Sequence, residues 1–102
     1  MAHPRFLIHS GAQISYSLIT EQEREAVDAA IAPLLKRPEK QWPRLGAVKL
    51  KSAKPLYLLH VDDSLRAIVQ PNAEGQPELL YLVRQELLDN YFREDGETVA
   101  TP

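Results

Sequence analysis

The stretch that decides the fold is Tyr57-Leu58-Leu59-His60-Val61-Asp62-Asp63-Ser64-Leu65-Arg66-Ala67-Ile68-Val69, followed by Leu79-Leu80-Tyr81-Leu82-Val83-Arg84. The first part contains two apolar runs of strand length, which the turn formers 62–64 separate. The second part is a third such run. Residues 56–61 and 65–69 therefore predict an antiparallel hairpin. A second turn over 72–77 leads to a strand over 79–83. Together they predict a meander of antiparallel strands.

Two further strands are predicted upstream of this meander. Residues 5–9 are a short apolar run that follows Pro4, which suits a strand start. Residues 47–51 alternate, so we expect Val48 and Leu50 on one face and Lys49 and Lys51 on the other, with the two lysines pointing away from the core. Between the helical region and this strand, residues 40–46 indicate a turn-rich linker that carries Trp42.

The segment between these strands predicts two helices. Thr20 and Glu23 have the spacing of a capping box, so a helix should begin there. Its apolar stripe comprises Val27, Ala30, Ile31, Leu34 and Leu35. Pro33 is expected to kink its last turn or introduce a 3₁₀ segment, and Pro38 prevents continuation. Ser10 is a plausible N-cap for a helix over 11–18, although the spacing there also fits a strand.

After the last strand, residues 85–93 predict a short helix, because the apolar residues Leu87, Leu88, Tyr91 and Phe92 recur at helical spacing. Residues 94–102 predict a disordered tail. Segregated runs of helices and strands indicate an α+β protein. We expect one domain over 1–93, with a helical hairpin packed on one face of a mainly antiparallel four-stranded sheet and a short C-terminal helix.

The composition bounds the function. The 102 residues include no cysteine, so a disulfide or thiolate metal site is excluded, and the content fits a reducing cytoplasm. No apolar run has the length of a membrane span.

The net charge of −2 hides an asymmetry along the chain. Residues 36–54 carry seven bases and one acid, a balance of +6, while the remaining five bases and thirteen acids give a balance of −8. The basic segment favours a phosphate-bearing partner, or else it is a solvated loop.

The order of these elements resembles the RelE/ParE superfamily, the toxins of bacterial toxin–antitoxin pairs. Residues 6–8 correspond to the family's opening strand and 11–35 to its helical hairpin, with Pro38 at its end. The segment 48–51 resembles the family strand "Lys-Leu-Lys/Gly", and 64–68 resembles "Asp-Tyr-Arg-Val-Ile". Where the family usually has Tyr-Arg-Leu-Arg-Val, this chain has residues 57–61 without either arginine and with His60 instead of one of them. The family's turn glycine is also missing.

The resemblance implies a toxin that cleaves mRNA, acting on the ribosome, with an antitoxin protein as partner and no cofactor. It suggests Lys49, Lys51 and Lys54 for phosphate contacts, and a cleavage site in which Lys49, Lys51, Arg66 and Arg84 surround one phosphate. It also suggests that Arg66 and Arg84 stabilise the negative charge of the transition state. Tyr91 or His60 would transfer a proton or stack on a base. Cleavage next to a 2′-hydroxyl requires a proton acceptor, an acid and cations, and histidine is well tuned for neutral pH.

Each of these candidates has a structural alternative. Arg66 and Arg84 could form surface ion pairs with neighbouring acids, which contribute only about 0–1 kcal/mol. Tyr91 falls on an apolar stripe and could pack. The main alternative function is a non-catalytic domain of the same fold that binds an antitoxin peptide or another protein across its sheet. An enzyme that uses a metal ion or a small-molecule substrate has no motif to support it.

Overall fold

The computed structural model describes residues 6–86. In chain order the elements are β1 (Leu7–Ile8), α1 (Ser10–Leu18), α2 (Glu21–Leu35), the 3₁₀ helix η1 (Glu39–Leu45), β2 (Val48–Lys49), β3 (Tyr57–His60), β4 (Leu65–Pro71) and β5 (Pro77–Arg84). The α+β class, the two predicted helices and the strand meander are therefore confirmed. Residues 85 and 86 are helical, but they do not form an element of their own in the described structure. The remainder of the segment predicted as a C-terminal helix, including Tyr91, and the predicted tail lie outside the described residues.

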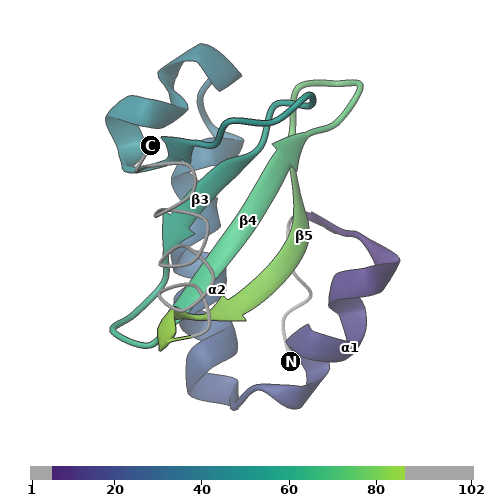
Figure 1. The fold of residues 1–102 in the computed structure, drawn as a ribbon, viewed down its shortest axis with the longest axis vertical. Helices are drawn as coiled ribbons and strands as arrows, with labels where there is room; N and C mark the ends of the chain where they lie inside the picture. Colours follow the sequence, from purple (N-terminus) through teal and green to yellow (C-terminus); the bar gives the residue numbers. More distant parts are fainter. Residues whose placement is uncertain (1–5, 87–102) are drawn as a thin grey trace, which may run out of the picture.

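The sheet has five strands in the order β1-β5-β4-β3-β2, so the prediction of four strands was wrong. Strands β2 to β5 form an antiparallel meander, and β1 joins the other edge parallel to β5. Parallel neighbours need a long crossover connection, and here the whole segment from α1 to β4 provides it. In Figure 1, α2 lies behind the sheet and α1 lies beside β5.

One face of the sheet packs on the helices and holds the core. Alternate residues of β3 and β4 point to it and are buried, as are the apolar positions of α2; the set is Tyr57, Leu59, Leu65, Ala67, Val69, Val27, Ile31 and Leu34. This period-two burial follows from the strand geometry, while the helix contributes its predicted stripe. The opposite side of the sheet, named here the open face, carries the other alternate residues.

Side chains cap the ends of the two helices and join them to each other. His9 rather than Ser10 is the N-cap of α1, because its Nδ1 accepts the Gly11 N–H at 3.1 Å, so that prediction was off by one residue. The Arg24 guanidinium donates to the carbonyl oxygens of Tyr16, Ser17 and Ile19 and so satisfies the free end of α1. The predicted capping box is present at Thr20 and Glu23. Tyr16 joins the two helices by donating to Asp28 at 2.8 Å, and burial followed by this bond raises the pKa of Tyr16 to about 12.

The segment predicted as a turn-rich linker is instead the 3₁₀ helix η1, organised around the fully buried Trp42. The Trp42 Nε1–H lies 3.3 Å from the Leu34 carbonyl oxygen and 3.2 Å from that of Arg37, which lets it cap the C-terminal end of α2. Its ring meets Tyr57 edge to face with centroids 5.1 Å apart. Pro33 leaves α2 continuous to Leu35, and the last turn tightens through the Lys36 N–H, which donates to the Pro33 carbonyl.

Candidate functional site

The seven bases of residues 36–54 lie on the end of α2, η1, β2 and the loop that follows, at one end of the sheet. We call this region the basic lobe; its cations are Lys36, Arg37, Lys40, Arg44, Lys49, Lys51 and Lys54. All seven are exposed. Within residues 6–86 the only ion pair joins Arg84 to Glu23, so none of the seven cations is neutralised by a carboxylate.

The single acid of the basic lobe is held inward. Glu39 begins η1, and its Oε2 accepts the Tyr57 hydroxyl hydrogen at 2.8 Å. Burial, followed by this bond, raises the pKa of Tyr57, so the phenol stays a neutral donor to the carboxylate. Because Tyr57 is itself buried, Glu39 is tied to the core side of η1. The seven cations are left facing solvent with little local compensation.

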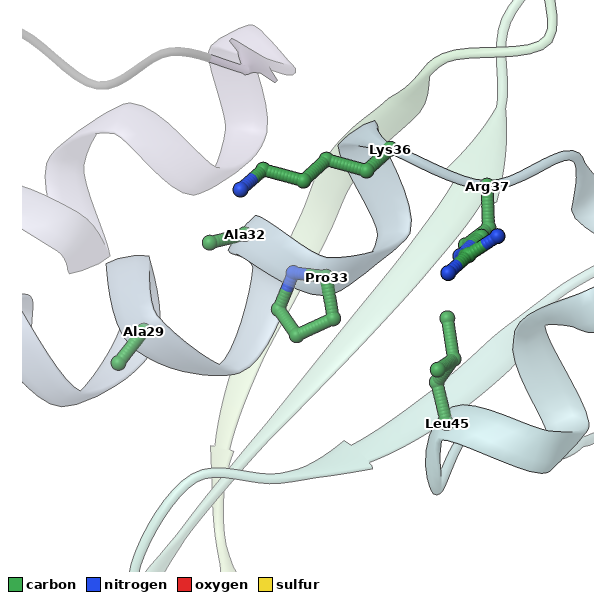
Figure 2. A pocket seen from close by; sticks show the side chains of 6 residues that line it. All are labelled: Ala29, Ala32, Pro33, Lys36, Arg37 and Leu45. Atoms are coloured by element: carbon green, nitrogen blue, oxygen red, sulfur yellow. The ribbon is translucent and has the colours of Figure 1, made fainter.

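A groove opens within the basic lobe, between α2 and η1. Its volume is about 540 Å³, and it is lined by Ala29, Ala32, Pro33, Lys36, Arg37 and Leu45. Figure 2 shows Lys36 extending over Ala32, while the Arg37 side chain points towards Leu45. The floor is apolar and the rim carries two cations. Such a surface suits a ligand with a flat or apolar part next to an anionic group, as in a nucleotide.

The structure separates three of the four cations that were predicted to surround one phosphate, namely Lys49, Arg66 and Arg84. Arg84 is the register partner of the buried Leu65 and therefore lies on the helix-covered face. Arg66 pairs with His60 and Val83 on the open face. Lys49 belongs to the edge strand, about 14 Å from β5 across three strand spacings. A single phosphate cannot contact all three.

Lys49 also differs from the predicted facing of its strand. Val48 is the register partner of Leu58 on the open face, whereas Lys49 pairs with the core residue Tyr57. The buried residues of β3 determine which residue of β2 lies on which face, because β2 has only two residues, and both are exposed. Lys49 stays exposed because it lies at the sheet edge. Lys51 and Lys54 follow in the exposed loop.

Arg84 forms an ion pair, which was its structural alternative, but with a partner that is not one of its neighbours in the sequence. Its guanidinium contacts the Glu23 carboxylate at 2.7 Å, and the same carboxylate accepts the Thr20 N–H of the capping box. The hydrogen bond from Arg84 is the main cause that lowers the pKa of Glu23. The partner of Arg84 is 61 residues away, beyond the reach of any local pattern. Its role is to join β5 to the start of α2.

His60 and Arg66 are the two catalytic candidates that the structure brings together. They are directly opposite each other on β3 and β4, so their side chains leave the open face side by side. His60 is exposed, whereas the Arg66 guanidinium donates to the carbonyl oxygens of Asp62 and Leu65 at 2.5 and 3.0 Å. Tyr91, the fourth candidate, lies outside the described residues.

A continuous apolar row crosses the open face, and it was not recognised from the sequence. Its members are direct register partners on four adjacent strands: Val48, Leu58, Ile68 and Tyr81. Val48 and Tyr81 are 59% and 56% exposed. His60 and Arg66 lie along one side of this apolar row, and the hydrogen-bonded pair Gln70 and Glu78 lies along the other. The alternation of residues along β3 and β4 indicates which of them share a face, but the row is defined only by the register that pairs the strands.

Comparison with known proteins returned no matching family model, curated protein or solved structure. Within residues 6–86 there is no group of three or more His, Asp or Glu side chains placed to hold a metal ion. Among the helices described, none is long and apolar enough to cross a membrane.

Proposed function

We propose that this chain is a RelE/ParE-like toxin domain that binds RNA through its basic lobe. The observation that carries the proposal is a set of seven exposed cations at one end of the molecule, none of which forms an ion pair within residues 6–86, in a chain whose remainder is acidic. Neutralising phosphates with such cations releases counterions, which drives binding even when the net charge of the protein is negative. The acidic remainder repels a polyanion and so restricts it to this end.

Three further features support RNA as the polyanion. The groove beside Lys36 and Arg37 offers an apolar floor for a ribose or an unstacked base. The basic lobe draws on four successive elements, which gives a track of phosphate contacts rather than one isolated point. The opening strand, helical hairpin and antiparallel meander occur in the order that the resemblance to RNA-cleaving toxins implies. That resemblance also implies an antitoxin partner.

Binding is tested by fluorescence anisotropy with a short labelled single-stranded RNA. We expect log K to fall with log salt between about 50 and 200 mM with a slope of about −3, as four or five phosphate contacts would give. Lys49→Gln or Lys51→Gln should each weaken binding roughly threefold. The matched control is Gln22→Glu, which changes the charge equally at an exposed position at the far end of α2, about 20 Å away. Equal losses in the control and in the lysine variants would contradict the proposal.

RNA cleavage is a second candidate function, favoured by the side-by-side placement of His60 and Arg66. The imidazole would accept the 2′-hydroxyl proton as the 2′-oxygen attacks phosphorus, the guanidinium would stabilise charge on the phosphorus oxygens, and the leaving 5′-oxygen would take a proton from water as its bond to phosphorus breaks. We expect the unsubstituted protein to release fragments ending in a 2′,3′-cyclic phosphate, and His60→Ala to abolish this while retaining RNA affinity. Mass spectrometry of the fragments checks the ends. Intact RNA after prolonged incubation with the unsubstituted protein would remove cleavage and leave binding untouched.

A non-catalytic protein-binding domain remains the alternative, and the apolar row on the open face is what supports it. We prefer RNA binding because, within residues 6–86, no carboxylate forms an ion pair with any of the seven cations of the basic lobe.

A further inference from the structure

The groove between α2 and η1 has a floor of small side chains that face away from the core. Ala29, Ala32 and Pro33 fall at i, i+3 and i+4 on α2, and all three are exposed. The buried Ile31 of the same helix faces the sheet instead. Leu45 of η1 completes the apolar lining. The volume of about 540 Å³ is within the range of pockets that bind small molecules.

Pro33 gives this floor a polar group as well. In an α-helix the N–H of residue 33 donates to the carbonyl oxygen of residue 29, but proline has no N–H. The Ala29 carbonyl oxygen therefore lacks its ordinary helical donor, and Ala29 lines the groove. A hydrogen-bond acceptor at this place matches a ligand that carries N–H or O–H groups, such as the base and the ribose of a nucleotide.

Two cations lie at the other end of the groove. Lys36 follows Ala29 by seven residues, so it lies about 10 Å further along the same face of α2. The Lys36 side chain extends over Ala32, and that of Arg37 points towards Leu45 (Figure 2). Neither cation forms an ion pair within residues 6–86. Because both line the groove, an anionic group bound there meets two positive charges.

The groove thus combines an acceptor, an apolar surface and two cations along one face of a helix. We propose that it is a subsite for a single nucleotide, with the phosphate at Lys36 and Arg37 and the base on the apolar floor. This inference rests on the proposed RNA binding and adds to it that one base leaves the stack, because only an unstacked base is available to a pocket. A free nucleoside monophosphate would occupy the same place.

Adenosine monophosphate, adenosine and inorganic phosphate are the probes, each titrated into the isotope-labelled full chain and followed by nuclear magnetic resonance. We expect the monophosphate to shift the amide signals of Ala29, Lys36 and Leu45, and to bind about fivefold more tightly than adenosine or phosphate. Ala32→Leu fills the floor and should weaken this binding about fivefold, the low end of what one stacked base contributes. The matched control Gln22→Leu places the same side chain at an exposed position of α2 about 15 Å away, and it should change nothing.

Anisotropy with a short labelled single-stranded RNA separates this inference from the proposed function. Ala32→Leu should weaken RNA binding about fivefold and leave the slope of log K against log salt the same, because it removes no cation. RNA binding that keeps both its slope and its affinity in Ala32→Leu would overturn the subsite and leave binding by the basic lobe intact. Absence of RNA binding, with the monophosphate still bound in the groove, would overturn the proposed function and support the groove as a nucleotide site. A monophosphate affinity equal to that of inorganic phosphate would overturn the subsite, since the cations would then attract any anion.

Discussion

At the scale of single residues, a few side chains each satisfy several backbone groups that would otherwise be unpaired. Arg24 covers three carbonyl oxygens at the end of α1, and Trp42 covers two at the end of α2. Helix ends leave their last carbonyls without internal partners, and burying such a group unsatisfied is costly. Arg24 therefore stabilises the end of α1, and Trp42 stabilises the end of α2, where the basic lobe begins.

Trp42→Phe tests this role. The variant keeps an aromatic ring in the core but removes the Nε1–H that caps α2, and it leaves a small void. We expect the free energy of unfolding to fall by about 2 kcal/mol, measured by urea denaturation. Tyr81→Phe, which removes a hydroxyl from an exposed ring, should change it by less than about 0.5 kcal/mol. A loss for Trp42→Phe as small as that of the control would mean that the cap contributes little.

At the scale of elements, Glu23 connects the start of α2 to the end of β5. Its carboxylate closes the capping box at Thr20 and pairs with Arg84. Because these contacts lower the pKa of Glu23, its ionised form favours the folded state. The resulting stability is present above the ordinary carboxyl pKa and is lost as pH falls through the lowered pKa.

Glu23→Gln should therefore lower the melting temperature at neutral pH, and the difference from the unsubstituted protein should shrink progressively as pH falls below the ordinary carboxyl pKa and through the lowered pKa of Glu23. Thermal unfolding followed by circular dichroism across this pH range measures it. Glu25→Gln is the control, because Glu25 is exposed on the same helix and takes part in no ion pair of the described structure. A Glu23→Gln difference that persists unchanged at acidic pH would show that charge is not the cause.

Local patterns predicted those elements whose signals lie within a few residues. The capping box, the stripe of α2 and the hairpin across Asp62-Asp63-Ser64 are such signals, and the Asp62 carboxylate indeed accepts the N–H groups of Ser64 and Leu65. Non-local features could not be predicted in this way. The pairing of Arg84 with Glu23, the facing of Lys49 and the parallel pairing of β1 with β5 all depend on strand register, which is set by tertiary packing.

The candidate site was predicted in part for the same reason. The basic segment is contiguous in sequence, so its cations had to lie in one region of the molecule. The convergence of Lys49, Arg66 and Arg84 required three strands to present them on one face, and the register places Arg66 on the open face and Arg84 on the other. Alternation along a strand says which residues share a face, but not which face the core will take.

At the scale of the whole molecule, charge and apolar surface are segregated. Seven cations occupy one end, the remaining chain has a balance of −8, and the apolar row crosses the open face up to the edge of the basic lobe. A polyanion bound at that end meets attraction from a small region and repulsion from the rest. Its affinity should therefore depend on salt far more steeply than the net charge of −2 would suggest.

The most direct test of this account is the salt dependence of RNA binding, measured by anisotropy for the unsubstituted protein, for Lys49→Gln/Lys51→Gln and for Gln22→Glu. We predict a slope of log K against log salt of about −3 that becomes shallower by about 1.4 units in the double variant and stays the same in the control. A slope near zero for the unsubstituted protein, or one that the two lobe substitutions leave unchanged, would contradict it.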